Sequence, residues 1–327
     1  MPKVTIREVA RACGVSPATV SKVLNGYKTG TSEATRARVR AAAERLGYRA
    51  DPHARNLPRG LHYIGISYPN HVPFPLEQPY HYLLQDALRG ALSDGGYRLV
   101  LGHEDWGPAG DAAHPWRTQV EAVVLLETWA GDLRSRRLDA LGLPHVAVGK
   151  DAGNYWVDVD NRGGIQGAVE HLLGLGHRDI AFLAGDAASF AASERLAGAH
   201  QALAAATQAQ LHVLPSDFTE VAGYRSTQQA LRTGLRFSAL IGVCDRTAVG
   251  ALMALADAGL RVPEDVSVVG FDDLVDGERY QLTTIRQPLA RVAEEITGWL
   301  AGDRERLRGG LILPVELVRR ASAGPVR

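Results

Sequence analysis

Apolar positions in the first fifty residues recur at the spacing of three short helices. The three apolar stripes are Ile6, Val9, Ala10 and Cys13; Val20, Val23 and Leu24; and Val39, Ala42, Ala43 and Leu46. Gly14 separates the first two because glycine adopts a positive φ without a Cβ clash, and Ser16 followed by Pro17 is a typical helix start. Two short helices joined by a glycine turn, with a longer third, predict a helix-turn-helix unit.

From residue 61 the pattern changes to short apolar runs that alternate with helical stretches. Strands are expected over residues 63–68, 97–102, 122–126, 145–149, 156–159, 180–184, 212–214, 239–243 and 266–271. Helices are expected over residues 82–93, 133–140, 163–175, 196–206, 223–232 and 247–258, and a loop over residues 71–81. Continuous apolar strands between helices are typical of parallel sheets covered on both faces. The body is therefore expected to be α/β, with two doubly wound lobes.

Composition narrows the class of protein. The 327 residues are 46% apolar and 22% charged, and no run of eighteen apolar residues could span a membrane. No apolar signal segment follows the first residue, and the two cysteines are too few for a disulfide framework. We therefore expect a cytoplasmic protein with no membrane partner.

The spacing of the candidate residues does not match the motifs of enzymes or metal sites. Gly149-Lys150 lacks the gap and the following Ser or Thr of a phosphate loop, and His103-Glu104 lacks the second histidine of a zinc helix. No Gly-x-Ser-x-Gly elbow occurs in the sequence. We therefore expect no enzymatic activity, no cofactor and no metal.

Charge is distributed unevenly although the total is zero. Residues 1–60 carry twelve basic and four acidic side chains, a net charge of +8, which leaves −8 for the other 267 residues. A small basic head on an acidic body indicates a nucleic-acid contact at one end. The charge alone fits a solvated basic face equally well.

The second expected helix carries small and hydroxyl side chains opposite its apolar stripe: Ala18, Thr19 and Ser21, together with Lys22. Small residues let a helix approach the major groove closely, and hydroxyls with a lysine reach phosphates or base edges. The structural alternative is a capped polar helix in a small bundle, and the basic excess argues against it.

Eight segments carry a family resemblance, at residues 4–10, 14–25, 45–48, 157–161, 171–182, 195–198, 268–273 and 282–288. In this order they resemble the lactose/galactose-repressor family of bacterial transcription regulators. The resemblance implies an α/β fold: an N-terminal three-helix helix-turn-helix DNA-binding domain plus a two-lobed, periplasmic-binding-protein-like body of doubly wound parallel sheets.

The resemblance also implies a division of the chain. Expected are a DNA-binding domain at 1–50, a hinge helix and linker at 51–60, and an effector-binding and dimerisation domain at 61–327. Its N-lobe is expected at about 61–160 and 287–311, and its C-lobe at about 161–286 and 312–327. Such a protein binds a pseudo-palindromic operator as a homodimer, usually as a repressor, under control of a small-molecule effector, here expected to be a carbohydrate. Only five residues follow Ser322, so we expect no heptad tail and a dimer rather than a tetramer.

Positions carried over from the family give the expected DNA contacts: Thr5, Ser16, Pro17, Ala18, Thr19, Ser21, Lys22, Asn25, Tyr48, Arg55 and Leu57. In the family, paired hinge helices wedge a leucine into the minor groove, and Leu57 takes that place. A hinge helix of one or two turns is too short to be stable alone, so it is expected to fold only on DNA. Pro58 directly afterwards departs from the family pattern and is expected to shorten this helix.

The family pattern likewise gives the expected effector contacts: Phe74, Arg195, Phe218, Cys244, Asp245 and Asp272. Charged groups bond sugar hydroxyls and an aromatic face covers the C–H surface. Taken singly, each of these residues also fits a structural role; their places after strands favour the cleft between the lobes. Cys244 stands where many relatives have asparagine, and the loop 70–75 departs from the usual Asn-Pro-Phe-Phe, so the pocket could also bind nothing.

Two other classes of protein stay open at this point. A solute-binding protein would share the body. It would need a signal peptide, however, and would have no use for a basic head. A DNA-binding regulator without an effector would keep the head and show no thermal shift with any small molecule.

Overall fold

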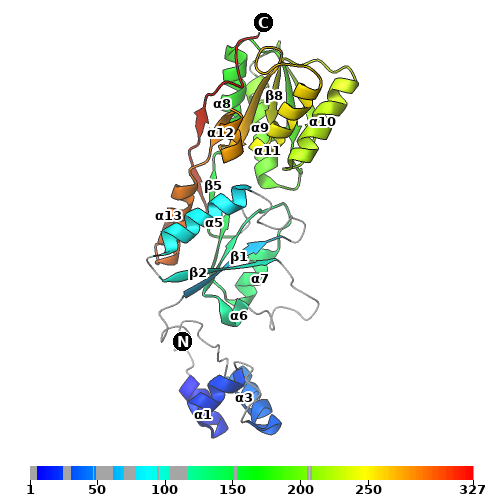
Figure 1. Cartoon of the computed structure of the whole chain (residues 1–327). Helices are drawn as coiled ribbons and strands as arrows, with labels where there is room; N and C mark the ends of the chain where they lie inside the picture. The colour runs from blue at the N-terminus through cyan, green and yellow to red at the C-terminus, as the bar shows by residue number, and fades with distance from the viewer. Residues whose placement is uncertain are drawn as a thin grey trace.

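The computed structural model describes residues 6–24, 31–46, 48, 62–69, 79–93, 96–103, 116–150, 153–204, 206 and 208–326 (Figure 1). The expected hinge segment 51–60, with Arg55 and Leu57, lies outside the described residues, and so do Thr5, Asn25 and Phe74. The described residues form a three-helix head and a body of two α/β lobes.

The head consists of α1 (Ile6–Cys13), α2 (Pro17–Leu24) and α3 (Glu33–Arg45). The three predicted apolar stripes meet in one small core of Val9, Ala10, Cys13, Val20, Val23, Val39, Ala42 and Ala43. Gly14 has a φ of +62°, as the turn between α1 and α2 requires. The Ser16 hydroxyl accepts a hydrogen bond from the Thr19 backbone N–H at 3.1 Å and so caps α2.

The first lobe, the N-lobe, is built on a six-stranded sheet in the order β11-β5-β4-β3-β1-β2, and all its neighbours are parallel. Its strands are β1 (His62–Tyr68), β2 (Tyr97–His103), β3 (Ala122–Leu125), β4 (His145–Val148), β5 (Trp156–Val159) and β11 (Leu311–Leu313). Its helices are α5 (Pro79–Leu92), α6 (Trp116–Gln119), α7 (Arg134–Leu141), α13 (Leu289–Leu300) and the short 3-10 helix Glu305–Leu307.

The second lobe, the C-lobe, repeats this order with β12-β10-β9-β8-β6-β7. Its strands are β6 (Asp179–Ala184), β7 (Gln210–Pro215), β8 (Ala239–Gly242), β9 (Ser267–Asp272), β10 (Thr283–Arg286) and β12 (Glu316–Val318). Its helices are α8 (Asn161–Gly174), α9 (Phe190–Ala204), α10 (Glu220–Arg232), α11 (Asp245–Asp257) and α12 (Val275–Arg279). The expectation of a purely parallel sheet needs one correction, because the edge strand β12 runs antiparallel to β10.

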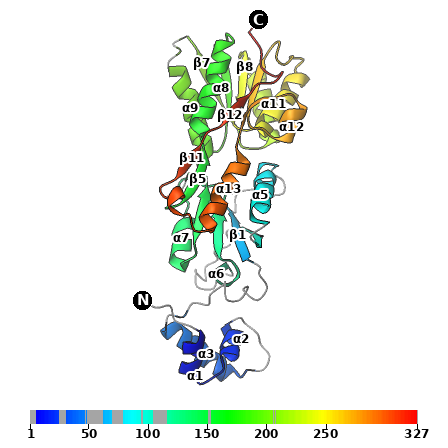
Figure 2. The same cartoon turned by 90° about the vertical axis from the view of Figure 1, so that its left-hand side faces the viewer.

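The chain passes between the lobes three times: between β5 and α8, between β10 and α13, and between β11 and β12. Figure 2 shows α13, β11 and β12 along this connection, beside β5. The third passage follows Leu313, two residues later than the expected boundary at 311, because β11 pairs with β5 and extends the N-lobe sheet.

The main apolar core runs through both lobes, from Ile64 and Trp299 to Phe182 and Phe271. Two smaller clusters cover the other faces of the sheets. The head has its own cluster, which shares no residue with the cores of the body. No helix of the described residues is both long enough and apolar enough to cross a membrane.

Candidate functional sites

The helix α2 presents a polar face away from the core of the head. Val20 and Val23 are buried, whereas Ser16, Pro17 and Lys22 are exposed. Thr19 and Ser21 are half-buried between these two faces, and Ala18 belongs to the same helix. The hydroxyl side chains and the lysine therefore lie on one side of α2, away from the core of the head. This is the face that we expect to meet the major groove.

Tyr48 takes a different position from the α2 residues. Its backbone N–H donates to the Ala43 carbonyl at 2.8 Å, and its half-buried side chain packs against the core of the head. Its location at the end of α3 fits a structural role, and its expected DNA contact stays a prediction.

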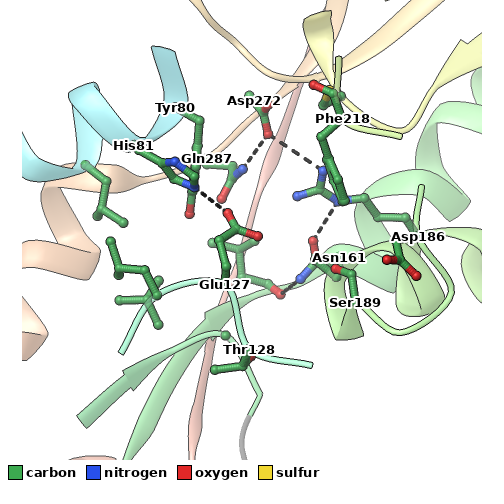
Figure 3. A pocket seen from close by; sticks show the side chains of 18 of the residues that line it. Tyr80, His81, Glu127, Thr128, Asn161, Asp186, Ser189, Phe218, Asp272 and Gln287 are labelled. Atoms are coloured by element: carbon green, nitrogen blue, oxygen red, sulfur yellow. Dashed lines mark hydrogen bonds and ion pairs between the residues drawn. The ribbon is translucent and has the colours of Figure 1, made fainter. Parts of the chain in front are cut away.

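A cavity of about 320 Å³ lies between the two lobes (Figure 3). The carboxyl ends of strands from both sheets supply its polar wall, including Asp158 of β5 and Asp272 of β9. Doubly wound sheets bind ligands at this edge, near the point where the strand order reverses. The volume lies within the range of small-molecule sites.

Arg195 forms the buried base of the C-lobe side. Its Nε donates to the Asn161 Oδ1 at 2.8 Å and its Nη1 to the Val243 carbonyl at 2.7 Å. Its guanidinium lies 3.7 Å from the centre of the Phe271 ring, and Nη1 lies 3.8 Å from the Asp272 Oδ1. Arg195 belongs to the second turn of α9, which begins six residues earlier than the sequence predicted.

Asp272 ends β9 with its carboxylate in the cavity wall. The Gln287 Nε2 donates to its Oδ1 at 2.6 Å. Burial raises the pKa of Asp272 well above its ordinary value, and the positive charge of Arg195 offsets only part of that rise.

Three residues at this cavity edge have a strained backbone. Asp272 has a φ of 126°, Asp273 of 62° and Glu127 of 52°. A non-glycine residue in this region costs about 1–3 kcal/mol, and such residues gather at functional sites. Asp273 is held in place by Arg320 and Arg286, which donate to its two carboxylate oxygens at 2.6 Å each.

Phe218 and Cys244 both line the cavity, as the sequence predicted. The Cys244 thiol faces the Phe218 carbonyl at 3.6 Å, and burial raises its pKa to about 12. It therefore stays a neutral thiol and is a poor hydrogen-bonding group for a ligand. Phe218 offers an apolar surface beside it.

Asp245 does not line the cavity, which corrects its expected role as an effector contact. It is 1% exposed, and its carboxylate accepts hydrogen bonds from the Leu274 backbone N–H and the Thr284 hydroxyl. Asp245 is the first residue of α11. Its side chain points toward the segment after β9 and connects this segment to β10. Asp245 thus stabilises the segment that follows Asp272.

The N-lobe side of the cavity contains residues that the sequence did not predict: Tyr80, His81 and Glu127. The first two lie in the first turn of α5, which begins at Pro79, where a loop to residue 81 was expected. Proline fits the first helical position because its missing N–H needs no partner there. For Glu127, the available signal was a charged residue directly after the apolar run 122–126.

His81 and Glu127 form a close pair, with His81 Nε2 and Glu127 Oε1 2.6 Å apart. Burial alone would raise the pKa of Glu127, but the hydrogen bond from His81 and the charges of Arg195 and Arg134 hold it below its ordinary value. Glu127 is therefore ionised at neutral pH. Tyr80 lies next to this pair, and burial together with the charge of Glu127 raises its pKa.

Asp158 and Asn161 connect the two halves of the site. The Asn161 Nδ2 donates to the Asp158 Oδ1 at 3.0 Å, while its Oδ1 accepts from Arg195. Burial raises the pKa of Asp158, although the backbone hydrogen bonds from Val159 and Lys150 oppose the rise. A continuous polar chain thus runs from β5 through α8 to α9 (Figure 3).

Arg134, which has no exposed surface, supports the cavity loop after β3. Its guanidinium pairs with the buried Asp132, with Nη2 and Oδ2 2.8 Å apart. It also donates to the carbonyls of Ser67 and Leu126 at 2.8 Å each, and its Cζ lies 4.7 Å from the Trp129 ring centre. One buried cation therefore joins the carboxyl ends of β1 and β3 to the loop that carries Trp129.

The same loop contacts the other lobe directly. Trp129 and Ser189 form an isolated antiparallel bridge, and the Ala130 backbone N–H donates to the Ala188 carbonyl at 2.9 Å. Trp129, Ala188 and Ser189 also line the cavity. Backbone hydrogen bonds at the cavity edge thus link the N-lobe loop after β3 to the C-lobe loop before α9.

The chemistry of this site is that of binding polar ligands. Carboxylates, a guanidinium, amides and hydroxyls surround the cavity together with aromatic faces from Tyr80, Trp129 and Phe218. No group of three or more metal-ligating side chains occurs within the described part of the chain. The arrangement can bond several hydroxyl groups while aromatic rings cover the apolar face of a ligand.

Comparisons with known proteins agree with both parts of the molecule. Residues 5–51 match the model of bacterial regulatory proteins of the lacI family, and residues 169–323 match a periplasmic binding protein-like domain. The transcriptional regulator CelR of Thermobifida fusca is 32% identical over 96% of this chain and 95% of its own length. The lactose operon repressor of Escherichia coli is 29% identical over 98% of this chain and 91% of its own length.

Solved structures show the same overall likeness. A CelR–cellobiose complex matches with a TM-score of 0.71 and 29% identity, over 98% of this chain and all of that one. The lac repressor dimer bound to operator and the anti-inducer ONPF matches with a TM-score of 0.70 and 28% identity, over 99% of this chain and all of the other.

The helix-turn-helix head and the two-lobed body define a class of protein. They are typical of bacterial transcription regulators that have a periplasmic binding protein-like domain. The chain belongs to the lacI family within that class, because relatives of that family align with it over nearly their full lengths. Its relatives are transcription regulators and not enzymes.

Proposed function

We propose that this chain is a repressor whose affinity for a pseudo-palindromic operator is controlled by a carbohydrate bound between the lobes. The cavity carries this proposal: polar groups from both sheets converge on one space of about 320 Å³, beside three strained residues. The likeness to a CelR–cellobiose complex supports a sugar as ligand. We assign DNA binding to residues 1–50, the hinge to 51–60 and effector binding to 61–327.

The coupling between effector and DNA is a population shift. A ligand that contacts both lobes favours one arrangement of them, and a dimer transmits this arrangement to the spacing of its two hinge segments. Allosteric couplings are typically about 1–3 kcal/mol, which corresponds to a change of roughly 5–150-fold in affinity. The bridge between Trp129 and Ser189 is a contact that such a shift would make or break.

Replacing Asp272 with alanine is expected to weaken effector binding by about ten- to a hundredfold, because it removes a buried carboxyl group that can bond ligand hydroxyls. DNA binding without effector is expected to stay as in the parent chain. The measurement is calorimetric titration with the sugar that stabilises the parent chain most, followed by operator release at increasing sugar concentration. Asp303, which is exposed, provides the control variant Asp303→Ala. An unchanged dose–response curve for Asp272→Ala would remove this residue from the site.

An apolar groove on the C-lobe is proposed as part of the homodimer surface. It is formed by Leu252, Met253, Ala256, Leu260, Val262 and Tyr280, with Ala321 and Ser322. Met253 and Tyr280 are 43% and 42% exposed, and large exposed apolar patches mark interaction sites. A second copy of the chain is the occupant that fits, because the similar lac repressor was solved as a dimer on its operator.

Replacing Tyr280 with aspartate is expected to weaken the dimer by about 2 kcal/mol or more, roughly thirtyfold in the dissociation constant, as for a buried aromatic anchor. Sedimentation analysis over a range of concentrations measures this change. Val221, which is 58% exposed on α10, gives the control variant Val221→Asp. Equal dimer affinity for the parent chain and Tyr280→Asp would exclude this surface.

A further inference from the structure

Acidic side chains outnumber basic ones in the wall of the cavity. Two guanidinium groups line it, those of Arg195 and Arg246. Five carboxylates line it among the described residues, namely Glu127, Asp158, Asp186, Asp217 and Asp272. Such an excess in a confined space with apolar walls concentrates the electric field, so the charge of a ligand matters strongly here.

The Arg195 guanidinium is largely engaged with the protein itself. Arg195 is 5% exposed and already bonds Asn161 and the Val243 carbonyl, with its face on the Phe271 ring. Arg246 also has an interaction partner of its own. An anion in the cavity would therefore have to displace existing contacts to reach the Nε or Nη1 of Arg195.

The carboxylates, in contrast, have open acceptor atoms on both sides of the cavity. Glu127 uses Oε1 for His81, and Asp272 uses Oδ1 for Gln287. No described residue donates to the Glu127 Oε2 or to the Asp272 Oδ2. Ligand hydroxyls can donate to the ionised Glu127 and can both donate to and accept from the Asp272 carboxyl group, whereas phosphate dianions and carboxylates offer only acceptors. Glu127 and Asp272 point into the same space from the two lobes (Figure 3).

We propose that the cavity takes uncharged polyols and rejects their anionic forms, with Glu127 as the specificity-determining residue on the N-lobe side. This inference rests on the proposed control by a carbohydrate and adds the charge class of that carbohydrate. Placing like charges together in a binding site suppresses wrong partners strongly. Burial already raises the pKa of Asp158 and Asp272, so the cavity disfavours even the negative charges of its own side chains.

The test separates the charge of a ligand from its shape. Thermal shift of the full chain with glucose, galactose, cellobiose, maltose and lactose selects the sugar that stabilises it most. Calorimetry then compares this sugar with its uronic acid and its uronamide, which share one shape and differ in charge. We expect the uronamide to bind within about tenfold of the parent sugar and the uronic acid about a hundredfold or more weakly.

Two charge-removing variants test the residues. Affinity is compared as the dissociation constant of the uronic acid divided by that of the uronamide, here called the affinity gap. Glu127→Gln is expected to reduce this gap by about tenfold. Asp186→Asn, on the C-lobe side, removes a second charge and can keep the acceptor for the Ala188 backbone N–H. The exposed control Asp303→Asn is expected to leave the gap unchanged.

The outcomes distinguish this inference from the proposed function. A uronic acid that binds within about tenfold of its uronamide overturns the charge selection and leaves carbohydrate control in place. If Asp186→Asn reduces the difference in affinity between uronic acid and uronamide and Glu127→Gln does not, Glu127 is not the specificity-determining residue. If none of the five sugars or their derivatives binds, the proposed carbohydrate control is overturned, and the charge selection with it.

Discussion

Deleting residues 1–60 is expected to abolish sequence-specific DNA binding, with affinity for a selected duplex falling by about a thousandfold or more. These residues carry the net charge of +8, whereas the other 267 residues carry −8. The remaining body therefore repels the phosphate backbone and also lacks α2, the helix that we expect to enter the major groove. Fluorescence anisotropy with a duplex selected from a random pool by the full chain measures the loss at fixed salt.

The body is expected to fold without the head, because the apolar core of the head shares no residue with the cores of the lobes. It should keep a cooperative thermal transition and the effector affinity of the full chain. Retention of the selected duplex by the folded body, in preference to a scrambled one, would refute the assignment of DNA recognition to residues 1–60.

Replacing Arg134 with methionine is expected to lower the free energy of unfolding by about 3–5 kcal/mol, because one partner of a buried ion pair is lost. The change leaves Asp132 charged and buried and removes the donors for the Ser67 and Leu126 carbonyls. Urea denaturation followed by tryptophan fluorescence measures the loss, since Trp129 lies against this guanidinium.

The same helix offers a matched control for Arg134. Arg136 is exposed on α7, so Arg136→Met is expected to change stability by no more than about 0.5 kcal/mol. Adding Asp132→Asn to Arg134→Met should recover part of the loss, because no uncompensated charge is then buried. A loss below about 1 kcal/mol for Arg134→Met would show that this pair does not hold the loop after β3.

Much of the fold follows from local patterns. The helices of the head were predictable from their apolar stripes and from Gly14 and Ser16, because short helices are set by caps and by one buried face. The strands β6 and β8 each differ from the predicted runs by one residue at one end, since buried parallel strands are continuous apolar segments. The strand β12 was not predicted, because a three-residue edge strand is defined by its pairing with β10 rather than by its own pattern.

The site was predictable only in part. Arg195, Phe218, Cys244 and Asp272 were expected at the cavity from the family pattern, and all four line it. Asp245 follows Cys244 in sequence but turns away from the cavity, because its carboxylate is drawn to the Leu274 backbone N–H and to Thr284. The sequence alone therefore could not predict which side chain, that of Cys244 or that of Asp245, would face a ligand.

The sequence by itself determined the basic head and the alternation of strands and helices, because these depend on composition and local spacing. The expected C-lobe contacts came from the resemblance to the family. Only the tertiary structure decided that Tyr80, His81 and Glu127 face Asp272 across one cavity, and that Arg134 braces the loop beside them. The reason is that these contacts join segments far apart in the chain, so long-range packing selects them.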